Sequence, residues 1–203
     1  MKGIPILTAL AFVFLGTACD QKKSEATSQP VTTRWKCHLC YEWHTDLPFS
    51  YGPLYPDPYL AIPEGERDKR TVLHNDFCII DDKHYLVRGN LEIPVRGSNE
   101  PFAWTVWVSL SKENFDRTIK LMETEGREAE PPYFGWLCTN LHLYPDTTHL
   151  KTHVHTRRVG SVPTIELEQT DHPLAVEQRN GITLDRVKEI AALLLHPDSK
   201  PKP

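Results

Sequence analysis

The chain has 203 residues, of which 39% are hydrophobic and 25% charged, and this is enough for one folded domain with short tails. Its formal net charge of −4 and the lack of basic clusters argue against nucleic acid as a partner. The sequence has no Gly-rich phosphate loop, no Gly-x-Ser-x-Gly elbow and no His-Glu-x-x-His helix. We therefore expect a protein without catalytic residues.

The N-terminus has the pattern of an export signal. Lys2 precedes an apolar run over residues 4–15, and three small residues lead into Cys19. The apolar run is too short to span a membrane as a helix. The order of an apolar run, small residues and a cysteine resembles the bacterial lipoprotein signal, which is cleaved before a cysteine that becomes lipidated. An ordinary secretory signal is the alternative. We predict a lipoprotein signal peptide over residues 1–18, lipidation of Cys19, and a membrane-anchored protein of the bacterial cell envelope that faces the periplasm or the exterior.

The segment after Cys19 is polar and shows no apolar period up to residue 33. We predict that residues 19–33 form the lipidated cysteine and a flexible tether, which spans about 20 Å for a chain of this length. A single globular domain is expected over residues 34–196. Residues 197–203 contain three prolines and are predicted to be a disordered tail.

The domain begins with the most chemically suggestive stretch of the sequence. Cys37 and Cys40 are separated by two residues, a spacing with which two thiolates grip one zinc ion, and His44 follows four residues later as a third candidate ligand. Cys78, Cys138 or a distant histidine would have to complete the site. Three interpretations are open: one structural zinc ion, disulfides or free thiols in an exported protein, and a redox-active pair of thioredoxin type.

The rest of the domain alternates between strands, helices and proline-rich loops. The expected loop is 47–58, the expected helices are 63–73, 112–124, 173–179 and 184–195, and the expected strands are 77–80, 84–95, 102–110, 133–138, 150–157 and 162–167. Alternation along 102–110 places Phe102, Trp104 and Val106 on one buried face with Val108 and Leu110. We predict an α+β fold in which a mostly antiparallel sheet is covered by two main helices, 112–124 and 184–195, and by long Pro-rich loops.

A second candidate site lies on the strand 150–157. His153 and His155 are two residues apart, so both point from the same face and could bind one metal ion. With a third ligand and a bound water, such a site would make the protein a small metal-dependent hydrolase. The simpler interpretation is a solvent-facing cationic strand that meets an acidic neighbour such as Glu166 or Glu168.

Motifs along most of the chain match one bacterial family. They are Cys37-x-x-Cys40 with His44, then 47–48, 56–61, 76–81, 88–94, 102–111, 132–138, 150–152 with His155, 172–178 and 181–183. Over about residues 35–196 the chain resembles the family catalogued as domain of unknown function 2199. Tyr41 stands where the family pattern often has glycine. The resemblance implies no activity.

These observations lead to one main interpretation of function. We expect a non-catalytic binding or structural module, anchored to the membrane by lipid, with a structural zinc at Cys37 and Cys40 and an unidentified protein or small molecule as partner. The alternatives are a small metal-dependent hydrolase that uses His153 and His155, and a thiol oxidoreductase at the Cys-x-x-Cys pair.

Overall fold

The computed structural model describes residues 34–198. The predicted signal peptide, the lipidated Cys19 and the tether up to residue 33 therefore lie outside the described residues, as does the predicted tail from residue 199 onward. Within the described range, no helix combines the length and the apolar character needed to cross a bilayer.

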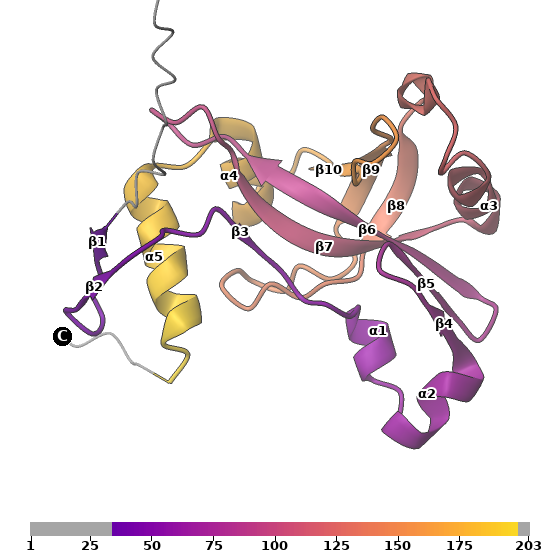
Figure 1. Cartoon of the computed structure of the whole chain (residues 1–203), viewed down its shortest axis with the longest axis horizontal. Helices are drawn as coiled ribbons and strands as arrows, with labels where there is room; N and C mark the ends of the chain where they lie inside the picture. The colour runs from indigo at the N-terminus through magenta and orange to yellow at the C-terminus, as the bar shows by residue number, and fades with distance from the viewer. Residues whose placement is uncertain (1–33, 199–203) are drawn as a thin grey trace, which may run out of the picture. The chain divides into compact units, whose positions relative to one another are not determined.

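Five strands close into a barrel of mixed direction (Figure 1). They are β6 (His84–Ile93), β7 (Phe102–Leu110), β8 (Tyr133–Leu137), β9 (Lys151–His155) and β10 (Thr164–Leu167). Neighbours from β6 to β10 pair antiparallel, and the circle closes where β10 runs parallel to β6, with Thr164 opposite Asn90. The pairing of β6 with β7 is long and continuous, so these two strands are the largest part of the barrel wall.

Short elements surround this barrel. They are the strands β1 (Trp35–Lys36), β2 (Trp43–His44), β3 (Ser50–Tyr51), β4 (Thr71–Leu73) and β5 (Phe77–Ile80), the helices α1 (Asp57–Leu60), α2 (Glu64–Arg70), α3 (Lys112–Lys120), α4 (Pro173–Asn180) and α5 (Leu184–Leu195), and the 3₁₀ turn η1 (Arg127–Ala129). β5 and β4 extend the sheet beyond β6, and β3 adds to β7 in parallel. β1 and β2 pair only with each other, as a separate two-stranded sheet.

The predicted fold class, a mostly antiparallel sheet covered by two main helices, is wrong. Alternation of buried and exposed side chains occurs in a barrel wall as well as in an open sheet, because in both cases every second side chain is buried. Closure depends on Gly89, where a Cβ atom would lie 2.7 Å from Ile165 Cδ1 and 2.9 Å from the Pro163 carbonyl oxygen. Since β10 crosses β6 this closely, the barrel closes at a residue without a side chain.

The two predicted helices form but do not cover a sheet. α3 starts after the N-cap Ser111, whose Oγ accepts a hydrogen bond from the Asn114 N–H, and it ends at Lys120. α5 has the predicted bounds, and Thr183 caps it in the same way. In Figure 1 the two helices lie at opposite ends of the barrel, with α5 beside the hairpin of β1 and β2.

The predicted core face of β7 is confirmed. Its five residues from Phe102 to Leu110 that alternate inward are all buried inside the barrel. Trp107 points to the other side and is also fully buried, because a second apolar cluster with Cys78, Ile80, Leu86 and Ile62 covers that side. The barrel wall is therefore packed on both faces at this point.

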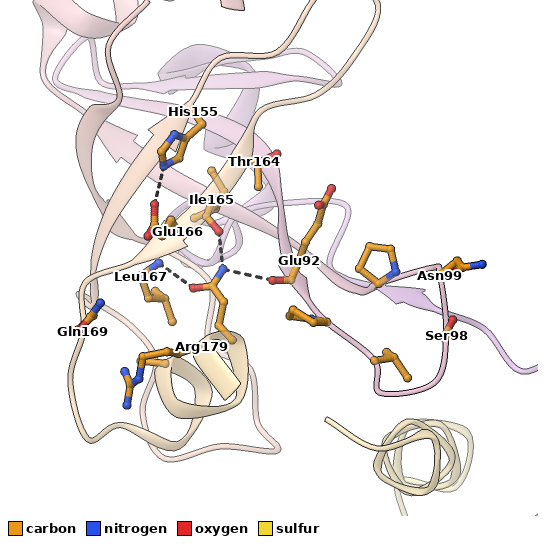
Figure 2. Close-up of a pocket in the computed structure, with 15 residues that line it drawn as sticks. Glu92, Ser98, Asn99, His155, Thr164, Ile165, Glu166, Leu167, Gln169 and Arg179 are labelled. Carbon is orange, nitrogen blue, oxygen red and sulfur yellow. Dashed lines mark hydrogen bonds and ion pairs between the residues drawn. The ribbon is translucent and has the colours of Figure 1, made fainter. Parts of the chain in front are cut away.

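The barrel has a seam where β6 and β10 separate after their one pairing. Gln178 of α4 fills it: its Oε1 accepts from the Leu167 N–H at 2.8 Å, and its Nε2 donates to the carbonyl oxygens of Ile165 at 2.7 Å and Glu92 at 3.4 Å (Figure 2). The side chain thus satisfies main-chain groups that a neighbouring strand would otherwise satisfy.

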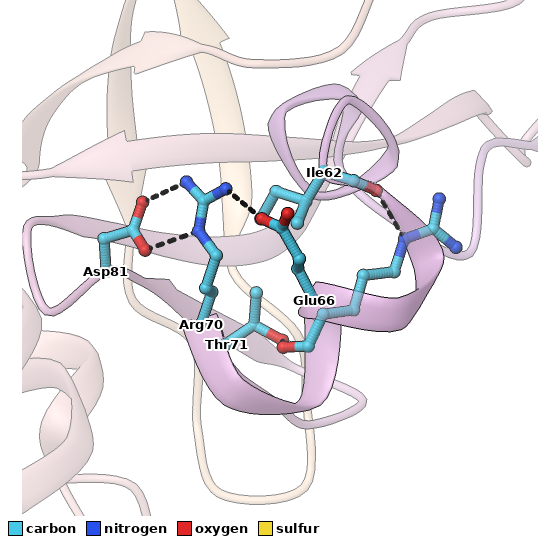
Figure 3. Close-up of polar contacts among 6 residues, drawn as sticks. Ile62, Glu66, Arg70, Thr71 and Asp81 are labelled. Atoms are coloured by element: carbon cyan, nitrogen blue, oxygen red, sulfur yellow. Dashed lines mark hydrogen bonds and ion pairs between the residues drawn. The ribbon is translucent and has the colours of Figure 1, made fainter.

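The outer strands are held to α2 by one arginine. The Arg70 guanidinium donates to both carboxylate oxygens of Asp81, at 2.8 and 2.6 Å, and to Glu66 one turn earlier at 3.1 Å (Figure 3). The bidentate contact holds the pKa of Asp81 below its usual value, mainly through the hydrogen bonds from Arg70. This contact joins the end of α2 to the turn between β5 and β6.

Candidate metal centre

The predicted zinc-binding stretch folds as a short hairpin, called here the N-terminal hairpin: β1, the turn 37–42, and β2. Trp35 lies opposite His44 in the two-stranded pairing. Within the turn, the Tyr41 N–H donates to the Cys37 carbonyl oxygen at 3.1 Å, and the Cys37 N–H donates to the Glu42 carbonyl oxygen at 3.0 Å. Tyr41 has φ +65°, a left-handed conformation that glycine adopts more easily. The turn therefore has a tight bend at Tyr41.

This bend brings three candidate ligands together. The Leu39 N–H donates to Cys37 Sγ at 3.4 Å, and Cys40 Sγ lies 3.3 Å from His44 Nε2. Such a hydrogen bond orients the sulfur for metal binding. The His44 ring stacks on Trp35 with the centroids 4.9 Å apart and an interplanar angle of 25°, so its orientation is fixed by packing.

The fourth member comes from the other end of the domain. His196 follows the last turn of α5, and its backbone N–H still bonds the Ala192 carbonyl oxygen at 3.0 Å. Its imidazole joins Cys37, Cys40 and His44, and one ligand atom from each of the four lies within 4.8 Å of the others. We call these residues the Cys2His2 group.

The distances in the Cys2His2 group fit a zinc ion. Tetrahedral zinc with bonds of about 2.0–2.3 Å places its ligand atoms about 3.3–3.8 Å apart, and Cys40 Sγ lies 3.3 Å from His44 Nε2. His196 Nε2 is buried and has no hydrogen-bond partner among the described residues. A buried imidazole nitrogen without a partner is unfavourable, and a metal ion would satisfy it.

The surroundings fit a closed site. Cys37 is fully buried, while Cys40, His44 and His196 are half-buried. Two thiolates and two imidazoles complete a tetrahedral shell, whereas catalytic zinc uses three protein ligands and leaves a position for water. The arrangement is therefore suited to holding structure together.

The structure separates the candidates that the sequence grouped. Cys37, Cys40 and His44 meet, but Cys78 and Cys138 belong to the second apolar cluster on the barrel wall and are not in the Cys2His2 group. Burial raises the pKa of the Cys78 thiol to about 11. Cys138 donates its S–H to the Trp136 carbonyl oxygen at 3.4 Å.

His196 is the distant histidine that the sequence analysis allowed as the residue completing the site. The four cysteines of the described residues are free thiols. The only available signal for His196 was its position directly after the apolar stripe of α5, which had to pack on the domain.

The second predicted pair, His153 and His155, shares the outer face of β9 as expected. His155 Nε2 lies 2.7 Å from Glu166 Oε2, and Figure 2 shows His155 and Glu166 beside the seam of the barrel. Lys151 pairs in the same way with Glu168 at 3.6 Å. Over residues 34–198, the Cys2His2 group is the only set of three or more His, Cys, Asp or Glu residues with gathered ligand atoms. β9 thus has the features of the simpler interpretation, a cationic strand with acidic neighbours.

A cleft of about 670 Å³ opens along the barrel seam. It is lined by β6, β10 and α4, and Arg179 and Gln169 lie at its edge (Figure 2). The polar groups of Gln178 in this cleft are bonded to main-chain groups, so they are not free for a ligand. The cleft does not indicate a ligand class.

The comparisons with known proteins give one match. A model of the family described as "Uncharacterized protein conserved in bacteria (DUF2199)" matches residues 36–182. The searches of curated proteins and of solved structures returned no match. The matched range includes Cys37, Cys40 and His44 and ends before His196.

Proposed function

Because the chain belongs to the DUF2199 family, whose description names no activity, we propose a function from the geometry of the Cys2His2 group. The protein is a non-catalytic module of the bacterial cell envelope, anchored through lipid on Cys19 and stabilised by one structural zinc ion. The observation that carries the zinc proposal is the His196 imidazole, which lies with two sulfurs and a second imidazole and whose buried Nε2 has no hydrogen-bond partner among residues 34–198.

The zinc ion fixes a segment that is weak by itself. β1 and β2 have two residues each and pair only with one another, and an isolated two-stranded hairpin is marginally stable in water. Zinc bound to Cys37, Cys40 and His44 would hold the turn, and His196 would tie it to the end of α5. The ion therefore joins the first and last parts of the domain.

The geometry supports the two alternatives less well. A thioredoxin-type pair needs its first cysteine at a helix N-terminus, where the thiol becomes reactive, but Cys37 is buried in the turn of a hairpin. A hydrolase at His153 and His155 needs a third ligand, and His155 is already bonded to Glu166.

Zinc binding is tested by metal analysis of the full chain, purified in detergent without chelator. We expect one zinc ion per chain by native mass spectrometry, and loss of zinc in His196→Ala. His84→Ala is the matched control, since His84 is exposed on β6 away from the Cys2His2 group. A wild-type chain without zinc, or a His196→Ala chain that keeps zinc at unchanged affinity, would refute the proposal.

Lipid anchoring is supported by the sequence alone, through the apolar run and the small residues before Cys19. It is tested by labelling cells with a clickable palmitate analogue. Wild type and Cys40→Ser should both incorporate the label, and Cys19→Ser should not. Equal labelling of Cys19→Ser would show that this cysteine is not the lipidation site.

A further inference from the structure

The N-terminal hairpin has one buried face and one exposed face. Strand alternation directs Trp35 and His44 toward the domain, where Trp35 is 2% exposed, and directs Lys36 and Trp43 to the outside. Trp43 is 58% exposed, and Tyr41 in the turn is exposed to the same extent. Two large aromatic side chains therefore lie in solvent within three residues of each other.

Basic side chains accompany these aromatics. The Arg34 guanidinium lies 5.4 Å from the centre of the Trp43 ring, and Lys36 is the strand partner of Trp43. We call Arg34, Lys36, Tyr41 and Trp43 the outer surface of the hairpin. Tryptophan and tyrosine concentrate at membrane–water interfaces, where the ring is buried and the polar edge stays wet, and arginine and lysine extend to the headgroups there.

The outer surface of the hairpin is also the part of the domain nearest the predicted anchor along the chain. Residues 20–33 separate Cys19 from Arg34, and a chain of that length reaches at most about 50 Å when fully extended. A tethered contact is intramolecular, so an interaction too weak to bind a free protein becomes populated.

We propose that the outer surface of the hairpin docks onto the lipid bilayer that carries the anchor, with Trp43 and Tyr41 in the interface. This inference rests on the proposed lipid anchoring. Glu42 and Asp46 balance the charges of Arg34 and Lys36 nearby, so the aromatic rings, and not net charge, provide the attraction.

The Cys2His2 group would orient this surface. Tyr41 directly follows Cys40, and Trp43 directly precedes His44, so both exposed aromatics are neighbours of ligands in the chain. A bound metal would thereby hold the two rings outward on a rigid turn. The rings would then meet the bilayer without first losing the conformational freedom of a loose loop.

The test uses the full lipidated chain reconstituted in phosphatidylcholine vesicles, with or without bromine on the acyl chains as a quencher. We expect bromine to quench part of the tryptophan emission of wild type. Trp43→Phe should remove most of this quenching, because phenylalanine keeps the contact but not the fluorophore. Trp136→Phe is the matched control: Trp136 is 40% exposed on β8 of the barrel and should leave the quenching unchanged.

The outcomes separate the docking from the anchoring. If the full chain does not sediment with vesicles, the anchoring fails and the docking fails with it. If the chain sediments but its emission is unquenched, or if Trp43→Phe is quenched like wild type, the docking alone is refuted. Quenching that requires anionic lipid would overturn the aromatic basis of the contact.

Discussion

Replacing Gly89 with alanine tests the closure of the barrel. The added Cβ would lie 2.7 and 2.8 Å from the Cδ1 and Cγ1 atoms of Ile165, and 2.9 Å from the Pro163 carbonyl oxygen. Carbon atoms in contact are normally about 3.5–4.0 Å apart, so the two contacts with Ile165 are about 1 Å too short. The contact with the Pro163 oxygen, below 3.0 Å, is also too short for a Cβ atom. The Ile165 side chain is fully buried in the core and has little room to move. The Pro163 oxygen is also held in place, because it accepts the Asn90 N–H that joins β10 to β6.

The overlap with main chain sets the expected magnitude. Overpacking a filled site costs about 1–3 kcal/mol, and we expect Gly89→Ala to lie near the upper end because relief requires opening the β6–β10 pairing. For a domain of this size, a loss of about 3 kcal/mol lowers Tm by about 6–12 °C. Thermal unfolding of the full chain in detergent, followed by tryptophan emission, measures the shift.

Gly65→Ala is the matched control. Gly65 lies within α2, and a Cβ there would meet no atom within 4 Å. Gly65 is the second residue of α2, and alanine there restricts the unfolded chain more than glycine does, so this variant should gain about 0.4–1 kcal/mol. If Gly89→Ala melts at the wild-type temperature, β10 does not cross β6 at this residue and the description of the seam is incorrect.

The seam, a buried thiol and the ion pair of Arg117 with Glu130 give three further tests. Gln178→Leu removes the side chain that bonds main-chain groups of β10 and leaves them to the water in the cleft. Urea unfolding should show a free energy of unfolding lower by about 2 kcal/mol for Gln178→Leu, and no change for Gln169→Leu. Burial raises the pKa of Cys78 to about 11, so iodoacetamide at pH 8 should leave it unmodified in the folded chain and alkylate it in urea; modification at equal rates would contradict its burial. Hydrogen bonds from Arg117 and then Tyr133 lower the pKa of Glu130 to about 2. Its stabilising effect should be present at pH 7 and disappear as the pH falls from about 4.5 to 2, so the urea midpoints of wild type and Glu130→Gln should converge in acid; a constant difference would refute this.

Local features of the fold were predictable from the sequence. The inward face of β7 and the caps Ser111 and Thr183 depend on residues two to four apart, which pattern and side-chain chemistry determine. Closure of the barrel depends on Thr164 meeting Asn90, more than seventy positions away, with Gly89 leaving the space. A single sequence does not contain that pairing, and alternation is the same in an open sheet and a closed one.

The same contrast between local and long-range information holds for the candidate metal centre. Cys37, Cys40 and His44 were predicted together because one turn of chain brings them together. Cys78 and Cys138 were also predicted as candidate ligands, but only because they are cysteines. Yet Cys78 stands two residues before Ile80 in a strand, and this spacing already places its side chain on an apolar face.

The position of His196, the fourth candidate ligand, shows what a metal ion would contribute to this fold. The barrel is closed by residues 84–167, within the range that matches the family. The N-terminal hairpin and the end of α5 lie outside this closed circle of strands, and no strand pairing connects them to it. A cross-link between His44 and His196 would restrict the unfolded chain over most of the domain. Such long closures have the largest effect on its entropy, about 5 kcal/mol in the loop model for disulfides. A metal ion in the Cys2His2 group would therefore add a direct link between two segments that are otherwise held by the packing of their apolar side chains on the core.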